Sequence, residues 1–266
     1  MRVVLAVLSL CVWILADTAH GAAAGSVDIS TSASSLSSPS NVYGPWTFED
    51  LDVQLPPDGE VGVHFENRRS ADRFNSSTRQ LLGLDASRAF SKAITLYAAA
   101  SFGSGAPYAR DRFTLETDVK VGRHWVPFIG GSLGSGYGIG ATQQLDAGAF
   151  YYFGDDYASF RYMPSWSKLL GAAQGYTFAL ALGHPGRTTE TFRAGTGGES
   201  DVSLITPLNP TLIGEREYTT SLSVKHWTGT ARGYHIDLLY GTLDRTNAAR
   251  IYSRISVGAG FFFALP

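Results

Sequence analysis

The sequence predicts an all-β protein, a closed antiparallel barrel of about twelve strands that spans a membrane. Three observations lead to this fold class. Apolar and polar residues alternate along most of the chain, the segments between the alternating stretches differ regularly in length, and no internal stretch is apolar enough for a membrane-spanning helix. A sheet that crosses hydrocarbon must close, because an open edge leaves backbone groups without hydrogen bonds.

Composition agrees with one large β domain. Of the 266 residues, 44% are hydrophobic and only 17% are charged, and the chain contains 30 glycines. The formal net charge of −2 offers no basic surface for nucleic acid.

The first residues, 1–24, have the features of a secretory signal peptide. Arg2 precedes an apolar run from Val3 to Ala16, and Ala22 to Ala24 provide a candidate cleavage site. The run is too short for a typical spanning helix. Cys11, the only cysteine, lies within it, so cleavage would leave no disulfide, thiol nucleophile or cysteine metal ligand.

Residues 25–58 are rich in serine and proline, with turn signals at Tyr43–Trp46 and Pro56–Gly59. We interpret this segment as a flexible periplasmic lead-in to the barrel.

The expected barrel covers residues 59–266. In its first strand, Val61, Val63 and Phe65 share one face, while His64, Glu66 and Arg68 share the other. The other expected strands lie at 82–87, 94–102, 112–121, 125–133, 143–152, 157–163, 175–182, 189–197, 217–227, 233–241 and 251–263. The apolar faces are expected to contact lipid and the charged faces to line the lumen.

The expected connections alternate in length. The long ones lie near 70–77, 103–110, 134–141, 164–173, 198–216 and 242–249, and the short ones near 90–92, 122–124, 154–156, 183–187 and 228–230. This alternation is typical of outer-membrane barrels, which have long extracellular loops and short periplasmic turns. Both termini would then be periplasmic.

The last strand carries a candidate assembly signal. Ser256, Gly258, Phe261 and Phe263 have a spacing that resembles the C-terminal signal of bacterial outer-membrane barrels. Ala264 to Pro266 follow the final aromatic residue, and we interpret them as a frayed tail. The alternative is the final strand of a soluble β-sandwich.

Charged residues on the expected lumen faces form a candidate functional network. Its members are His64, Glu66, Arg68, Arg112, Glu116, Asp118, Lys120, His235, Asp237 and Arg254. Barrel closure would make the first strand a neighbour of the last, which carries Arg254. The network could be a solute-selective constriction or a set of paired side chains that keeps a narrow barrel closed.

Enzymatic and metal sites have weaker support. Ser132 lies in a G-x-S-x-G stretch, Gly130–Gly134, but that motif requires a strand-to-helix elbow. His235 and Asp237 share a strand face and could be part of a catalytic triad. The six histidines show no His-x-His or His-x₃-His pair, so we expect no metal site and no cofactor.

Three stretches resemble the YaiO-type outer-membrane β-barrel family: Arg68–Phe74, Tyr108–Val121 and Tyr151–Tyr162. The resemblance covers about residues 59–263 and implies an outer-membrane location without a settled reaction. Some relatives look associated with surface polysaccharide secretion. We therefore expect a non-enzymatic envelope conduit or anchor that contacts outer-membrane lipids, the barrel-assembly machinery and an export system. The alternatives are an outer-membrane enzyme acting on lipid or surface glycan through His235 and Asp237, and a soluble ligand-binding barrel.

Overall fold

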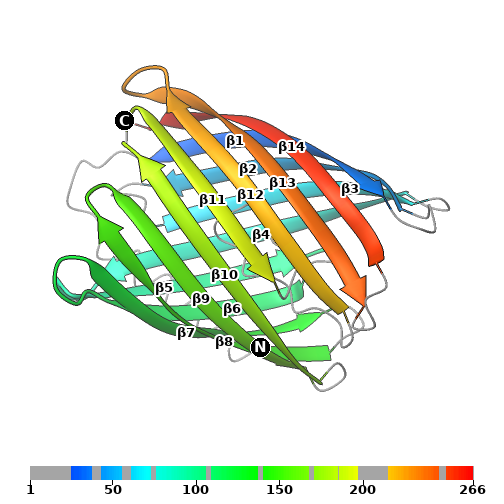
Figure 1. Ribbon diagram of the computed structural model, residues 1–266, viewed down its shortest axis with the longest axis horizontal. Helices are drawn as coiled ribbons and strands as arrows, with labels where there is room; N and C mark the ends of the chain where they lie inside the picture. The colour runs from blue at the N-terminus through cyan, green and yellow to red at the C-terminus, as the bar shows by residue number, and fades with distance from the viewer. Residues whose placement is uncertain are drawn as a thin grey trace.

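Fourteen antiparallel strands close into one barrel in the computed structural model (Figure 1). It describes residues 25–37, 43–55, 61–72, 76–105, 109–136, 140–167, 171–184, 186–196, 215–245 and 250–265. The predicted all-β closed barrel is confirmed, but the predicted count of about twelve strands is wrong. The predicted signal peptide, residues 1–24, lies outside the described residues.

The strands follow one another around the barrel in chain order. Their bounds are β1 (Ser26–Ser37), β2 (Tyr43–Leu55), β3 (Val61–Asp72), β4 (Ser76–Ala89), β5 (Ile94–Gly103), β6 (Ala109–Val119), β7 (Trp125–Gly136), β8 (Gly140–Phe153), β9 (Asp156–Ser167), β10 (Gly171–Gly183), β11 (Thr188–Thr196), β12 (Glu215–Trp227), β13 (Arg232–Arg245) and β14 (Arg250–Ala264).

The two additional strands, β1 and β2, come from the segment interpreted as a flexible lead-in. That interpretation is wrong for residues 26–37 and 43–55, which pair along their length with neighbouring strands. The alternation of apolar and polar residues is weak in β1, where small Ser, Thr and Ala residues occupy both faces. In β2 it is clear only at the end, where Leu51, Val53 and Leu55 alternate with polar residues.

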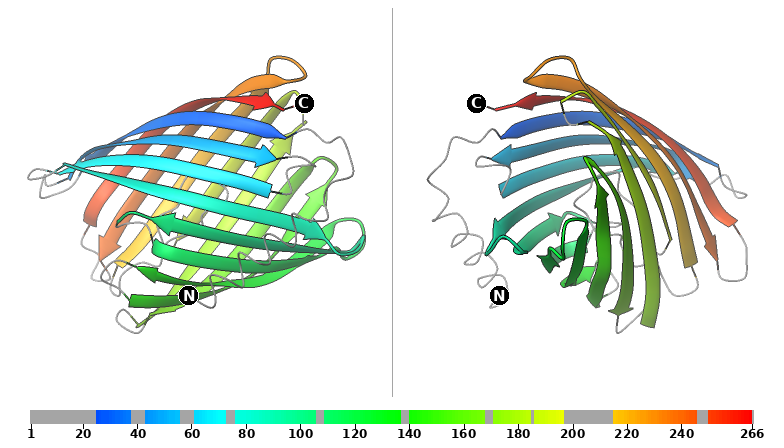
Figure 2. Two further views of the ribbon diagram at one scale, coloured as in Figure 1. Left: turned by 180° about the vertical axis from the view of Figure 1, so that it is seen from behind. Right: turned by 60° about the vertical axis from the view of Figure 1, so that its left-hand side comes forward.

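The barrel closes between its first and last strands, β1 and β14, which lie side by side in Figure 2. Ser26 is paired with Ala264, and Ser37 with Ser253. The predicted contact between β3 and the last strand is therefore wrong, because β1 and β2 lie between them. The predicted frayed tail also starts too early: Ala264 belongs to β14, and the amide of Leu265 donates a hydrogen bond to the carbonyl of Gly25.

The same pairing places the start of β1 and the end of β14 at one end of the barrel, which we call the terminal end; the opposite end is the loop end. The strand bounds leave 184–187 and 228–231 among the turns at the terminal end, and 137–139 and 197–214 among the connections at the loop end. Only 197–214 is much longer than the turns. The regular alternation of loop lengths is thus weaker than predicted, because the strands continue into most of the expected loops.

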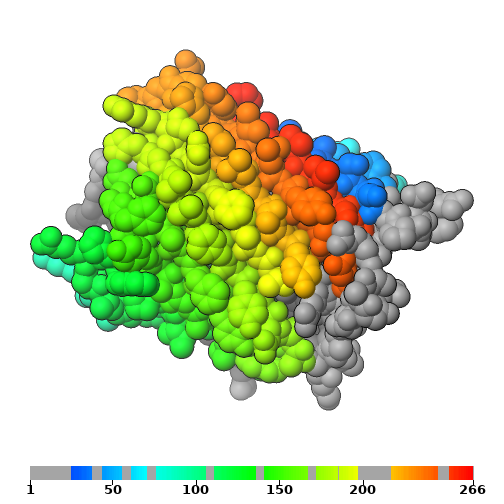
Figure 3. Space-filling model, in the orientation of Figure 1, coloured from blue at the N-terminus to red at the C-terminus, as the bar shows by residue number. Residues whose placement is uncertain are grey.

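The two faces of the wall differ as the sequence predicts. Side chains such as Leu115, Ile129 and Phe261 point outward, and Phe261 is 64% exposed. Figure 3 shows the outer surface over β9 to β13. Phe178 on β10 and Leu222 on β12 are among the exposed apolar residues of these strands. The alternate positions face inward and are largely polar. In the described part of the chain, no helix has the length and hydropathy needed to cross a membrane.

Candidate functional site

The inward faces of the strands carry the charged residues of the candidate site. The predicted lumen residues that lie on these faces are His64, Glu66, Arg68, Arg112, Glu116, Asp118, His235, Asp237 and Arg254. Lys120, the tenth, lies instead in the exposed turn after β6. The structure divides these residues into separate groups on different parts of the wall.

The first group, the Arg161 cluster, consists of Arg112, Glu116, Gln144, Asp146 and Arg161 on β6, β8 and β9. The guanidinium of Arg161 binds both carboxylate oxygens of Glu116, with one nitrogen–oxygen distance of 3.0 Å, and lies 3.7 Å from Asp146. Gln144 accepts a hydrogen bond from Arg112 at 3.1 Å and donates one to Asp146 at 2.8 Å. Asp146 is only 1% exposed, so its charge depends on these contacts.

Phe128 and Gly130, on β7, shape the space around this cluster. The Arg161 guanidinium lies 4.2 Å from the centre of the Phe128 ring, which adds a cation–π contact. Gly130 is paired with Glu116, and a Cβ atom there would lie 2.5 Å from the carbonyl oxygen of Leu115. Glycine is therefore required for the close approach of β6 and β7 beneath the cluster.

Ser132 follows Gly130 on the inward face of β7, where it is buried. The stretch Gly130–Gly134 is continuous strand, so it lacks the strand-to-helix elbow that exposes a nucleophilic serine. The motif at Ser132 therefore reflects a glycine-rich strand.

The second group, the His235 cluster, consists of Asp28, Lys225, His235 and Asp237 near the terminal end. Nδ1 of His235 lies 2.6 Å from Asp237, and Nε2 lies 2.9 Å from Asp28. Lys225 lies 3.7 Å from the other carboxylate oxygen of Asp28. Both ring nitrogens of His235 thus contact carboxylates, whereas a triad requires the second nitrogen to face a nucleophile.

The third group, the Trp46 cluster, joins β14 to β2 and β3 across the barrel seam. Arg68 lies 4.0 Å and Arg254 lies 5.4 Å from the centre of the Trp46 ring, and Tyr252 packs edge-on against the same ring. Phe48 completes the buried apolar group. The expected proximity of Arg254 and Arg68 therefore exists, but Trp46 mediates it and the strands are not adjacent.

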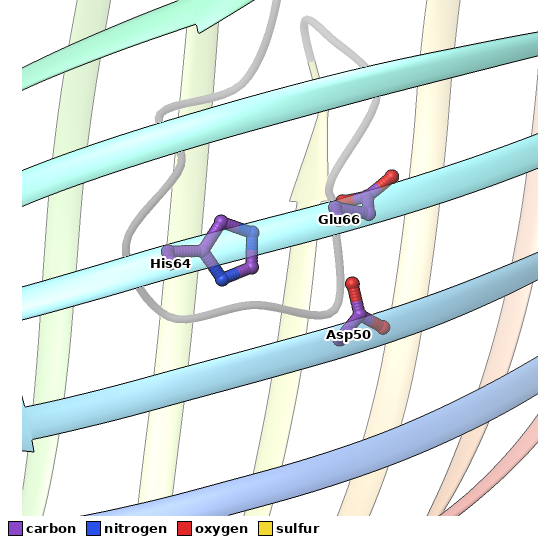
Figure 4. Close-up of side chains that lie close together, drawn as sticks. All are labelled: Asp50, His64 and Glu66. Atoms are coloured by element: carbon purple, nitrogen blue, oxygen red, sulfur yellow. The ribbon is translucent and has the colours of Figure 1, made fainter.

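The fourth group brings Asp50, His64 and Glu66 together on β2 and β3 (Figure 4). Asp50 is paired with Glu66, and Asp52 with His64. Nδ1 of His64 lies 2.6 Å from Asp52. The sequence pointed to His64 and Glu66 but missed both aspartates, because they belong to the segment interpreted as a lead-in.

Arg161 and Asp146 were also missed. Their inward positions could have been read from the alternation of their strands, but their partners could not. Glu116 and Arg161 lie on strands that are not adjacent, and only the curvature of the closed wall brings them together. Chemically, these groups form a lining of fixed charges that bind one another.

Comparison with known proteins identifies the family. The model of the YaiO membrane beta barrel domain matches residues 25–202, which is more than half of the chain. No curated protein matches the chain significantly.

Solved structures share the fold at low sequence identity. The chain is similar to the CymD monoaromatic hydrocarbon channel, with a TM-score of 0.61, 9% identity and coverage of 92% of this chain and 89% of that one. It is also similar to a bacterial polysaccharide outer membrane secretin, with a TM-score of 0.51, 7% identity and coverage of 91% and 98%.

Proposed function

We propose that this chain, which belongs to the family of YaiO membrane β-barrel domains, is an outer-membrane conduit for small hydrophilic solutes. The observation that carries the proposal is the opposite chemistry of the two faces of the closed wall. Large apolar side chains point outward, whereas Glu116, Arg161 and other charged residues point inward. Such a wall excludes lipid from its interior and provides a polar lining.

The paired charges suit selection better than catalysis. In the Arg161 cluster, each ionised group is held in place by an opposite charge or an amide. Fixed charges along a lumen favour or exclude ions by their sign without chemical change. We do not propose an enzyme, because both nitrogens of His235 contact carboxylates.

We extend the proposal to the partners of the barrel. Outer-membrane lipids would contact the apolar outer face, and the assembly machinery would recognise the end of β14. Phe261 and Phe263 point outward on that strand, while Ser256 and Gly258 point inward. No contact among the described residues favours a polysaccharide over smaller solutes, so we do not propose an export function.

Current measurement in a planar bilayer tests the conduit. The barrel refolded without residues 1–24 should give steady single-channel currents. Replacing Arg161 by Gln removes a positive charge from the interior, so the reversal potential in a KCl gradient should move toward that of K⁺. The matched control is Arg69→Gln, which removes the same charge from an exposed side chain on the outer face of β3 and should leave the reversal potential unchanged.

A barrel that inserts, as shown by its heat-modifiable mobility on gels, but passes no current would overturn the proposal. Its lining charges would then act as a plug. Equal shifts from Arg161→Gln and Arg69→Gln would show that the lining does not set selectivity.

A further inference from the structure

We propose that Asp50, His64 and Glu66 form a binding site for a divalent transition-metal cation such as Zn²⁺ on the interior wall. The proposal goes beyond the conduit function and does not depend on it, because a closed barrel could hold the ion equally well. It rests on the positions of the three side chains, on the orientation of the imidazole and on the chemistry of the donor set.

The strand register brings the three ligand groups together. Residues 64 and 66 project from the same face of β3 because they are two apart. Asp50 is the direct partner of Glu66 on the antiparallel strand β2. One donor atom from each of the three side chains lies within 4.8 Å of the others, a separation that one ion can bridge with small side-chain movements.

The imidazole of His64 has the orientation of a metal ligand. Its Nδ1 atom lies 2.6 Å from the carboxylate of Asp52, the direct partner of His64 on β2. Figure 4 shows the ring lying along β3 on the side of Glu66, with the carboxylate of Asp50 turned toward the same place. A carboxylate that holds one ring nitrogen directs the other toward the metal and raises its basicity, as in carboxylate–histidine–zinc triads.

The neighbouring strand β4 fixes the position of this ring. Gly83 is paired with His64, and a Cβ atom at position 83 would lie 3.3 Å from the Cβ atom of His64. A larger side chain there would press on the histidine. On the same strand, Asp85 places a further carboxylate beside β3, opposite Gly62. This carboxylate adds negative charge beside His64, which favours a cation, while the positive charge of Arg68 lies two residues from Glu66 on the same face of β3.

The donor set selects the class of metal. One imidazole nitrogen and two carboxylate oxygens match Zn²⁺ and related divalent ions, whereas Ca²⁺ and Mg²⁺ prefer oxygen ligands alone. Three protein ligands leave one position of a tetrahedral Zn²⁺ ion open to water or a solute. All three side chains belong to strands, so the wall of the barrel holds the site.

Binding of ZnCl₂ to the refolded barrel tests the proposal. The protein is refolded from inclusion bodies, which removes lipopolysaccharide as a competing chelator, and is stripped of metal before isothermal titration calorimetry. We expect one Zn²⁺ ion per chain. His64→Ala should abolish binding, and Asp52→Asn should weaken it about 10- to 100-fold, because Asp52 acts only through the ring.

The matched control is His184→Ala, in the turn between β10 and β11. His184 also contacts a carboxylate, Asp155 at 2.5 Å, but both side chains are exposed and lie outside the site. This variant should bind Zn²⁺ as the unmodified chain does. Heat-modifiable mobility confirms that each variant is folded, and Asp52→Asn remains as a test if His64→Ala does not fold.

Absence of Zn²⁺ binding by the folded, unmodified barrel would overturn the proposal. Binding that survives both His64→Ala and Asp52→Asn would do the same. Because the titration needs no ion flow, failure of this site is distinguishable from failure of the proposed conduit.

Discussion

Arg161 contacts two carboxylates inside the barrel, those of Glu116 and Asp146, so we expect its removal to lower the stability of the fold. Arg161→Met would leave Glu116, which is 8% exposed, and Asp146 without the guanidinium that contacts both. Loss of one partner from a buried ion pair typically lowers the free energy of unfolding by 3–5 kcal/mol. Because Arg161 is itself partly exposed, we expect a loss of about 3 kcal/mol in urea titrations followed by tryptophan fluorescence.

Lys92→Met is the control for this loss. Lys92 lies in the exposed turn between β4 and β5 and should change the free energy of unfolding by less than about 0.5 kcal/mol. Similar values for the two variants would show that Arg161 contributes no more than an exposed turn residue.

Two adjacent residues of β6 test which face of the wall contacts lipid. Leu115 is 47% exposed on the outer face near the middle of the strand, whereas Thr114 belongs to the inner face. Leu115→Arg should lower the free energy of unfolding in lipid vesicles by about 2–4 kcal/mol, and Thr114→Arg by much less. Equal losses would contradict the assignment of the faces.

At the scale of single residues, the sequence predicted which face of the wall a side chain lies on better than it predicted which residues that side chain contacts. Strand alternation alone placed Glu116, Asp237 and Arg254 on the inner face, because a period of two fixes the side of a sheet. The partners of Glu116 could not be predicted in the same way. Arg161 reaches Glu116 across the interior. The distance between the two side chains depends on the curvature of the barrel and on the strand register, and the alternation of polar and apolar residues encodes neither.

Strand β1 shows why an element can escape detection. Its serines and threonines give little contrast between faces, so local composition indicated a flexible linker. Strand β2 contains Pro45, and its alternation is clear only near its end. What makes both segments strands is the neighbour on each side, since every backbone group in a closed wall must find a partner. Because the prediction did not include these strands, it did not include Asp50 and Asp52 among the lumen residues.

A cross-linking experiment tests the seam between β1 and β14. Ala33 and Val257 are direct partners and both point outward. Directly opposed residues of antiparallel strands have Cα atoms about 4.5–5.5 Å apart, within the range for a disulfide bond. In a chain that carries Cys11→Ser, Ala33→Cys with Val257→Cys should cross-link after mild oxidation, as a mobility shift on non-reducing gels.

The matched control pairs Val257→Cys with Val63→Cys on β3. A barrel that began at β3 would bring those two strands together, whereas β1 and β2 separate them in the structure. Cross-linking at 63 and not at 33 would show that the first two strands do not close the wall.

At the scale of the whole molecule, closure is what the sequence predicted best. Twelve strands were expected at places where the structure has strands, and the requirement that a membrane sheet lack open edges predicted that they close. The predicted number of strands was wrong, because closure is compatible with any even number. The pairing of Ser26 with Ala264 adds a consequence for the whole barrel, since it places the start of β1 and the end of β14 at one end.

This arrangement predicts the sidedness of the barrel in the outer membrane. Lys92 and Ser104 flank β5, and both are exposed. Ser104 lies at the loop end, which also carries the long connection 197–214, while Lys92 lies at the terminal end. Long connections are extracellular in outer-membrane barrels, so Ser104 should face the medium and Lys92 the periplasm. In chains with Cys11→Ser, a membrane-impermeant maleimide should label Ser104→Cys in intact cells and Lys92→Cys only after permeabilisation. The reverse pattern would invert the barrel, and labelling of both in intact cells would contradict a transmembrane wall between them.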